Sequence, residues 1–303
     1  MCTRRLNMKR CLVGLAVVWA AVWATGAMAQ EPKVGLSIVN TGCAQAVEAL
    51  LVPGGSVLNK RAANFSAFLI KHGSRYMLFD TGLGRGIDAQ YRQDMPVWAR
   101  LAFGYEKPLH PAADQLTQAG IGALERVVLS HSHWDHASGV ADFPGVRIAV
   151  AKEEMQRIQQ ASEGVGTAWP SQVGDAATVW EPLVFADKPY MGYARSLDLY
   201  GDGAVVLVPM PGHTPGSVGL FVTVDSGRRY FLIGDVAWTR DALAQGAAKF
   251  WLAGKLVDGD ASGTQQSLEQ VQRLMQRDPE LQVVPAHDSA VQDALGYFPR
   301  WVP

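Results

Sequence analysis

Nine short apolar runs recur along this chain, and each is bounded by Gly, Pro or Asp. Runs of this length that are rich in Val, Leu, Ile and aromatic residues are typical of β-strands. The predicted strands are 34–40, 65–72, 75–80, 126–130, 146–151, 204–210, 217–224, 229–235 and 281–286. They form two strand-rich stretches, which predicts two separate β-sheets.

Segments with helical periodicity follow both strand-rich stretches, at 111–119, 151–161 and 263–277. In the last of these, Leu268, Val271, Leu274 and Met275 fall on one helical face. Two sheets with helices on their outer faces give an α/β fold, a four-layer αβ/βα sandwich. Residues 160–203 break the pattern, and we expect them to be an insertion near the open edge of the site.

Residues 1–29 have the layout of a secretory signal peptide. Four basic residues and no acidic one precede an apolar run, which ends in the small-x-small sequence Ala27-Met28-Ala29. The alternative is an uncleaved anchor, because the apolar run is about long enough to span a bilayer. The small residues and the polar "QEPK" that follows favour cleavage. We therefore expect a mature chain of residues 30–303, periplasmic or secreted, without stable membrane association.

The charge and the cysteine content of the chain limit which binding partners and which disulfides are expected. Removal of the four positive charges of the leader takes the formal net charge from −1 to −5. Nucleic-acid binding favours a clustered basic surface, which is not evident, so a small-molecule substrate is the expected partner. Cys43 is then the only cysteine left. No intrachain disulfide can form, and the oligomeric state stays open.

Residues 130–137 read "SHSHWDHA", directly after an apolar run. His131 and His133 alternate along an extended segment, so both rings can point to one side. Asp135 and His136 follow a turn in the chain and point to a neighbouring place. Further potential ligands follow later strands: His213, Asp235 and His287. Five of the seven histidines thus lie at strand ends, where a rigid sheet can hold them precisely enough for metal binding.

One loop could in this way serve two metal ions roughly 3.5–4 Å apart, with a carboxylate such as Asp235 between them. Such a pair lowers the pKa of water and supplies hydroxide, which attacks a carbonyl while a metal stabilises the oxyanion. Two divalent metal ions are therefore the expected cofactor. Zinc suits a nitrogen and oxygen ligand set best, and iron, manganese or cobalt would also fit.

The combination of "HSHWDH" with His213, Asp235 and His287 resembles the metallo-β-lactamase superfamily of hydrolases. "FDTG" at 79–82, "GHTPGS" at 212–217 and "IGD" at 233–235 strengthen the likeness, which extends from about residue 34 to 290. The resemblance implies that residues 30–303 form one hydrolase domain. It also implies that Asp80, in "FDTG", is hydrogen-bonded near the ligand loop and holds a ligand ring in place.

The resemblance further implies a role for each ligand. His131, His133 and His213 would bind the first metal, and Asp135, His136 and His287 the second. Asp235 would bridge the two. Asp135 would in addition act in catalysis, by orienting the attacking water or taking up a proton.

Departures from the family pattern narrow the substrate. Asp235 is unlike the strictest β-lactam-cleaving types, and the intact His133 is unlike the redox branch. The motif style is closest to the quorum-quenching lactonases that open N-acyl-homoserine lactones. Many of those carry a substrate-contacting tyrosine three residues after the bridging aspartate, where this chain has Trp238. Trp238 could contact a substrate through its indole N–H, or could simply pack as a wall residue.

The sequence leaves several functions open. We expect hydrolysis of a lactone or related ester bond. The alternatives are a β-lactam hydrolase, a thioester, phosphotriester or sulfate-ester hydrolase on the same site, and a metal-binding protein without enzymatic activity. Aromatic residues in and beyond the insertion could line a pocket for an acyl chain or pack a core: Trp169, Trp180, Tyr190, Tyr193 and Trp251.

Overall fold

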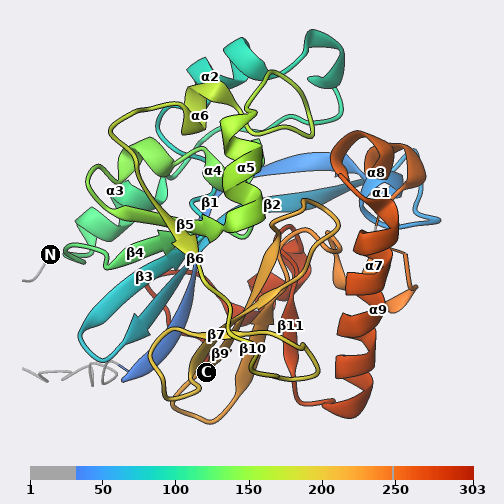
Figure 1. Ribbon diagram of the computed structural model, residues 1–303. Helices are drawn as coiled ribbons and strands as arrows, with labels where there is room; N and C mark the ends of the chain where they lie inside the picture. The colour runs from blue at the N-terminus through green and yellow to red at the C-terminus, as the bar shows by residue number, and fades with distance from the viewer. Residues whose placement is uncertain (1–31, 248) are drawn as a thin grey trace, which may run out of the picture. The chain divides into compact units, whose positions relative to one another are not determined.

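A computed structural model describes residues 32–247 and 249–303, which contain two β-sheets (Figure 1). The predicted leader, residues 1–29, lies outside the described residues. The first sheet has the strand order β1-β2-β3-β4-β5-β6. Its strands are β1 (Val34–Val47), β2 (Lys60–His72), β3 (Arg75–Phe79), β4 (Arg126–Val128), β5 (Arg147–Ala151) and β6 (Val179–Leu183). Strands β1 to β3 are antiparallel, and β3 to β6 are parallel.

The second sheet has the order β11-β10-β9-β8-β7. Its strands are β7 (Leu197–Asp198), β8 (Val205–Pro209), β9 (Val218–Thr223), β10 (Arg229–Leu232) and β11 (Gln282–Val284). Only the β10–β11 pair is parallel. All nine predicted strands are present, and β1 and β2 are longer than the sequence indicated.

Alternate residues of each strand enter different cores, because successive side chains point to opposite faces. Met77 and Phe79 of β3 pack between the sheets with Leu220 of β9. Leu78, between them in sequence, packs on the outer face under the helices. Phe221 of β9 likewise faces outward, toward the other helical layer. Burial on both faces explains why these strands read as continuous apolar runs.

Helices cover both outer faces. On the first sheet they are α3 (Ala112–Gln118), α4 (Trp134–Ala137), α5 (Lys152–Gln159) and α6 (Pro170–Val173); on the second they are α7 (Arg240–Ala244) and α9 (Ala261–Arg277). Figure 1 shows α9 along one flank and α3 and α5 on the other. The four-layer αβ/βα sandwich predicted from the sequence is confirmed.

The three predicted helices correspond to α3, α5 and α9. The carboxylate of Asp260 caps α9 by accepting from Ser262 N, and Leu268, Val271 and Leu274 are buried as expected. The remaining helices are α1 (Glu48–Leu51), α2 (Ile87–Asp94), α8 (Trp251–Val257) and α10 (Ser289–Leu295), with the 3₁₀ turns η1 (Val97–Ala99) and η2 (Val140–Asp142). Within the described ranges, no helix has the length and apolar character to cross a membrane.

Residues 160–203, which the sequence sets apart as an insertion, contain α6, β6 and β7. Strand β6 pairs with β5 at the edge of the first sheet, and β7 pairs with β8 at the edge of the second. This segment therefore connects the two sheets and contributes an edge strand to each.

Candidate metal centre

The loop after β4 has the conformation that the sequence indicated. His131 and His133 lie on an extended segment, and His133 is the N-cap of α4 with backbone angles of −70° and 159°. Asp135 and His136 occupy the first turn of α4, so they point to a different place. Strand β4 belongs to the first sheet, whereas His213, Asp235 and His287 follow β8, β10 and β11 of the second.

All seven side chains are buried and meet in three overlapping groups. The groups are His131 with His133 and His213; His131 with His136 and Asp235; and Asp135 with His136 and His287. Within each group the potential ligand atoms lie no more than 4.8 Å apart. Residues separated by more than 150 positions in sequence thus converge on one centre.

Asp235 lies between two sets of side chains. The first set is His131, His133 and His213, and the second is Asp135, His136 and His287. Its Oδ1 is 3.2 Å from His136 Nε2 and 3.1 Å from His287 Nε2. Its Oδ2 is 3.6 Å from His213 Nε2. A carboxylate with one oxygen toward each set is suited to bridging two cations.

Two features of the centre fit a metal ligand set. The 3.2 Å approach of His136 Nε2 to Asp235 Oδ1 lacks hydrogen-bond geometry, and both buried atoms are without a hydrogen-bond partner among the described residues, although buried polar atoms are nearly always paired. Imidazole and carboxylate groups are also the donors that zinc and its neighbours prefer. The residues present therefore fit a pair of divalent cations.

Hydrogen bonds at Nδ1 orient three of the rings. His213 Nδ1 lies 2.7 Å from Asp258 Oδ1, His136 Nδ1 lies 2.9 Å from Asp80 Oδ2, and His287 Nδ1 lies 2.8 Å from the Asn64 carbonyl. Because these oxygens only accept, each Nδ1 carries the hydrogen. The Nε2 atoms of all three rings consequently face the centre, as metal ligands require.

The electrostatics differ between the two sets. Burial, followed by the neighbouring imidazoles, lowers the pKa of His131 and His133 well below the usual value. Burial and then Lys249 lower the pKa of His213 to about 4. These three rings are therefore neutral at pH 7, the protonation state in which imidazole binds metal.

In the second set, nearby carboxylates oppose the effect of burial on the histidine pKa values. Burial alone would lower the pKa of His136 and His287, but Asp80 and Asp235 outweigh it at His136, and Asp235 and Asp135 outweigh it at His287, so both pKa values are raised. The same histidines hold the pKa of Asp235 well below its usual range despite its burial. Burial raises the pKa of Asp135, which makes this carboxyl the better proton acceptor of the two aspartates.

Asp80 lies where the sequence placed it, beside the ligand loop. Its Oδ2 accepts from His136 Nδ1 at 2.9 Å, and its Oδ1 accepts from Ser130 N at 2.6 Å. The side chain is fully buried, and the backbone is left-handed, with a φ of 60°. Asp80 thus orients one ring and anchors the residue that precedes His131.

Trp238 forms part of the wall of the centre. Its indole N–H donates to Asp235 Oδ2 at 2.8 Å. The predicted contact with a substrate carbonyl stays a prediction, and the N–H would first have to leave Asp235.

Residues that the sequence did not single out support the ligands from outside. Lys249 Nζ is buried and donates to the Asp235 carbonyl at 2.6 Å and to Asp258 Oδ1 at 2.8 Å. Asp258 in turn holds His213. Burial opposes ionisation of Asp258, but the hydrogen bond from His213 and the charge of Lys249 lower its pKa. This chain of contacts ties two ligands together.

Glu154 of α5 ties two ligand loops together in a similar way. Its fully buried carboxylate accepts from Ser132 N at 2.8 Å and from Thr214 Oγ1 at 2.6 Å. Ser132 lies between two ligands, and Thr214 follows a third. A sequence signal existed: Glu154 is four residues before the buried Ile158, so it falls on the apolar face of its helix.

Arg157 makes a contact that competes with metal binding. Its Nη2 lies 2.9 Å from His133 Nε2, which accepts because a guanidinium only donates. A neutral ring with a metal on one nitrogen has no lone pair left on the other. Metal ligation by His133 therefore requires Arg157 to give up this hydrogen bond.

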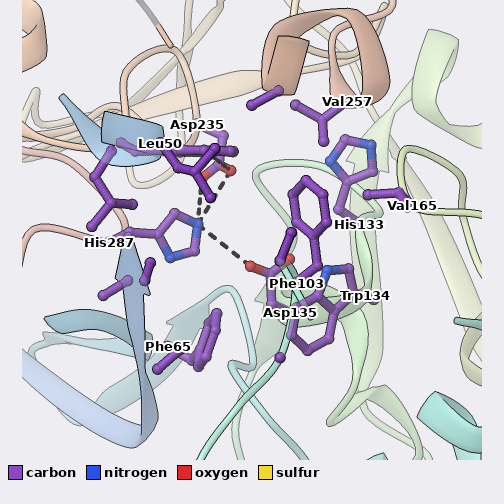
Figure 2. Close-up of a pocket in the computed structure, with 18 of the residues that line it drawn as sticks. Leu50, Phe65, Phe103, His133, Trp134, Asp135, Val165, Asp235, Val257 and His287 are labelled. Carbon is purple, nitrogen blue, oxygen red and sulfur yellow. Dashed lines mark hydrogen bonds and ion pairs between the residues drawn. The ribbon is translucent and has the colours of Figure 1, made fainter. Parts of the chain in front are cut away.

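A pocket of about 660 Å³, partly open to solvent, leads to the centre. Figure 2 shows His287 on one side, with interactions to Asp235 and Asp135, and His133 and Trp134 opposite. Beyond these groups the wall is apolar, formed by Ala44, Ala46, Leu50, Leu51, Ala63, Phe65, Ala102, Phe103, Val165, Ala253 and Val257. The metal centre thus lies at the polar end of an apolar pocket.

The aromatic residues suggested from the sequence do not line this pocket. Trp169 is fully buried and stacks on Trp134 with ring centroids 5.7 Å apart. Tyr193 packs against Phe221 in the outer core, and Trp251 is exposed. The core-packing alternative therefore holds for Trp169 and Tyr193.

The chain is similar in sequence to known metal-dependent hydrolases. The model of the metallo-beta-lactamase superfamily matches residues 65–287. A "Probable metallo-hydrolase" of Mycobacterium tuberculosis is 31% identical over 195 residues, which are 58% of this chain and 59% of that protein. The chain thus spans about three fifths of that relative. The N-acyl homoserine lactonase AttM of Agrobacterium fabrum is 26% identical over 192 residues, 61% of this chain and 70% of the lactonase.

Solved structures share the fold at low identity. An N-acyl homoserine lactone hydrolase, with the product N-hexanoyl-L-homoserine at its catalytic metal centre, aligns with a TM-score of 0.67 and 15% identity. The alignment covers 89% of this chain and 99% of the other. The dizinc quorum-quenching lactonase AidC aligns with a TM-score of 0.58 and 17% identity, over 90% and 98%.

Proposed function

Because the chain belongs to the metallo-β-lactamase superfamily, we propose that it is a dinuclear metallohydrolase that opens a lactone or a related ester bond. One observation carries the proposal. Seven buried histidine and aspartate side chains meet in three overlapping groups at the polar end of an apolar pocket, with the Asp235 oxygens facing His136, His287 and His213.

In the proposed holoenzyme, His131, His133 and His213 would hold one metal and Asp135, His136 and His287 the other, with Asp235 shared between the two sets. The bound pair would supply a nucleophile at neutral pH and polarise the carbonyl of the substrate. Zinc is the metal we propose, since neutral imidazole and carboxylate ligands suit it best.

The residues of the chain prepare the site for this chemistry. Asp135 lines the pocket, and its Oδ2 is 3.4 Å from His287 Nε2. It can take the proton of the attacking water and return it to the leaving oxygen. Trp238 acts through Asp235, because its N–H holds the carboxylate oxygen that would face the first metal.

The pocket supports a substrate with an apolar group beside the bond that is cleaved. Alanine, leucine, valine and phenylalanine side chains form its wall, and the polar groups gather at one end. An acyl chain can bury its methylene groups there, at about 0.8 kcal/mol each. A relative named as an N-acyl homoserine lactonase and structures of such enzymes support the lactone assignment.

A substrate panel on metal-loaded protein tests the proposal. Lactones with short and long acyl chains should be opened by protein containing two zinc ions per chain. Thioesters, β-lactams, phosphotriesters and sulfate esters should react more slowly. Preferential cleavage of any of those four would replace the lactone assignment, and no hydrolysis of any substrate in the panel, lactones included, would reject the hydrolase.

Asp135→Asn separates catalysis from binding alone. We expect activity to fall by about 100-fold or more while at least one metal remains bound, since general acid–base groups contribute that much. The matched control is Asp142→Asn, also on the loop region after β4, whose carboxylate accepts from Arg85 N away from the centre. Equal activity of the Asp135 variant and the wild type would exclude this role.

We also propose export to the periplasm or medium, on the basis of the leader at residues 1–29. Cell fractionation with mass spectrometry of the amino terminus tests it. A chain that stays in the cytoplasm with its leader intact would contradict the proposal.

A further inference from the structure

Exposed apolar side chains gather around the mouth of the pocket. Of ten large apolar side chains that are exposed in the described chain, eight lie on three short segments: Val57, Leu58, Val97, Trp98, Leu101, Trp251, Leu252 and Leu256. Leu58 and Leu101 are 90% and 100% exposed. Single exposed apolar residues are ordinary, but a contiguous group marks an interaction surface.

The three segments adjoin the pocket, because each contains or directly follows a residue of its wall. Leu51 of α1, Phe103 after η1 and Val257 of α8 all line the pocket. A second groove places Leu101 with Leu50 and Lys60. We call the eight exposed residues the apolar rim.

The charges on these segments are of one sign. Residues 52–60, 95–104 and 249–257 contain Lys60, Arg100, Lys249 and Lys255 and no acidic residue, although the whole chain has a formal net charge of −1. Lys60 and Lys255 are exposed, and Lys255 Nζ lies 5.2 Å from the centre of the Trp251 ring. Lys249 is buried against Asp258, and Glu106 lines the groove with Lys60, so the exposed positive charges on the rim segments are Lys60 and Lys255.

We propose that the apolar rim docks reversibly on an anionic lipid surface. Trp and Leu side chains would enter the boundary between headgroups and acyl chains, while Lys60 and Lys255 would face the phosphates. Tryptophan beside lysine is typical of residues at this boundary. The mouth of the pocket would then open toward the membrane, where amphiphilic small molecules partition. A second copy of the chain fits less well, because a two-fold interface would bring the cationic segments together.

Vesicle sedimentation of the full chain tests the proposal. The vesicles are phosphatidylcholine alone and an equimolar mixture of phosphatidylcholine and phosphatidylglycerol. The rim variant, Leu58→Ser with Leu101→Ser, removes side chains that have almost no contacts in the folded protein, so folding should be unaffected. The matched control is Val179→Ser with Val184→Ser, exposed apolar residues at and beside the edge strand β6. The leader is common to all variants and cancels in the comparison.

We expect the rim variant to bind the mixed vesicles about tenfold more weakly or worse, since each leucine loses its apolar burial. The control should bind like the wild type. Lys60→Gln with Lys255→Gln should weaken binding to the mixed vesicles more than to phosphatidylcholine alone. Equal binding of rim variant and control would overturn the proposal. So would a wild-type dimer in sedimentation velocity that the rim variant abolishes, because the rim would then be an interface between copies.

Discussion

Replacing Asp80 with asparagine tests how the centre holds its second metal. Both oxygens of Asp80 accept from buried donors, Ser130 N at 2.6 Å and His136 Nδ1 at 2.9 Å. Asparagine tolerates the left-handed backbone of this position, with its φ of 60°. Its amide, however, has one accepting oxygen and one donating nitrogen. One of the two donors must therefore lose its partner in Asp80→Asn.

The structure indicates the size of the effect. A hydrogen bond to a charged group contributes about 1.5–3 kcal/mol. If His136 loses that orienting bond, the second metal should bind about 10–100-fold more weakly, the range found when a partner of a metal ligand is removed. The first metal should be affected little, because His131, His133 and His213 do not contact Asp80 through hydrogen bonds. Competition titration with a chromophoric zinc chelator measures the two affinities separately.

Asp94→Asn is the matched control. Asp94 is also a buried carboxylate with two donors, Ser171 N at 3.0 Å and Ser171 Oγ at 2.5 Å, but it contacts no ligand. Both donors reach one oxygen, Oδ2, which the amide oxygen of asparagine can replace, so Asp94→Asn should leave zinc affinity unchanged. Equal loss of zinc affinity in both variants would contradict this role of Asp80. So would an Asp80→Asn variant that binds two zinc ions as tightly as the wild type.

Three further substitutions, and one control, test residues around the centre. Lys249→Met leaves Asp258 buried without its cation and should lower the free energy of unfolding by about 3–5 kcal/mol in chemical denaturation; an unchanged midpoint would contradict the buried ion pair. Arg157→Leu should lower the zinc dissociation constant in the same chelator titration, because Arg157 competes for His133, and weaker binding would refute that competition. Gly212→Ala would place a Cβ 2.0 Å from Thr264 N and should displace the His213 loop, lowering both melting temperature and zinc affinity. Gly227→Ala, in an open turn, should leave zinc affinity unchanged.

The meeting of the seven candidate ligands at one place could be predicted because their signal is local. Each follows an apolar run, and the packing of two sheets brings the ends of β4, β8, β10 and β11 to one place. The role of Asp80, which follows β3, was instead implied by the family resemblance of "FDTG" at 79–82. Burial on both faces makes such strands easy to find in a sequence.

The supports of the ligands could not be predicted in this way. Lys249 and Asp258 are nine residues apart and meet only because α8 folds back over Asp235 and His213. In sequence they are ordinary charged residues. The edge strands β6 and β7 were missed for a related reason: they are short and only partly buried, so their apolar pattern is weak.

The residues of the pocket wall are harder to predict from the sequence than those of the metal centre. A metal ligand is identified by its own chemistry, whereas a wall residue is identified only by what lies opposite. Leu51, Phe103 and Val257 come from three segments that are far apart in the sequence. Helix α8 buries Val257 toward the pocket and exposes Trp251 and Leu252 outward, so it lacks the one-sided periodicity of a surface helix. The same two-sided pattern is what a helix would show if its outer face met lipid. The vesicle experiment tests that possibility on α8 through Lys255 and on the neighbouring rim segments through Leu58 and Leu101.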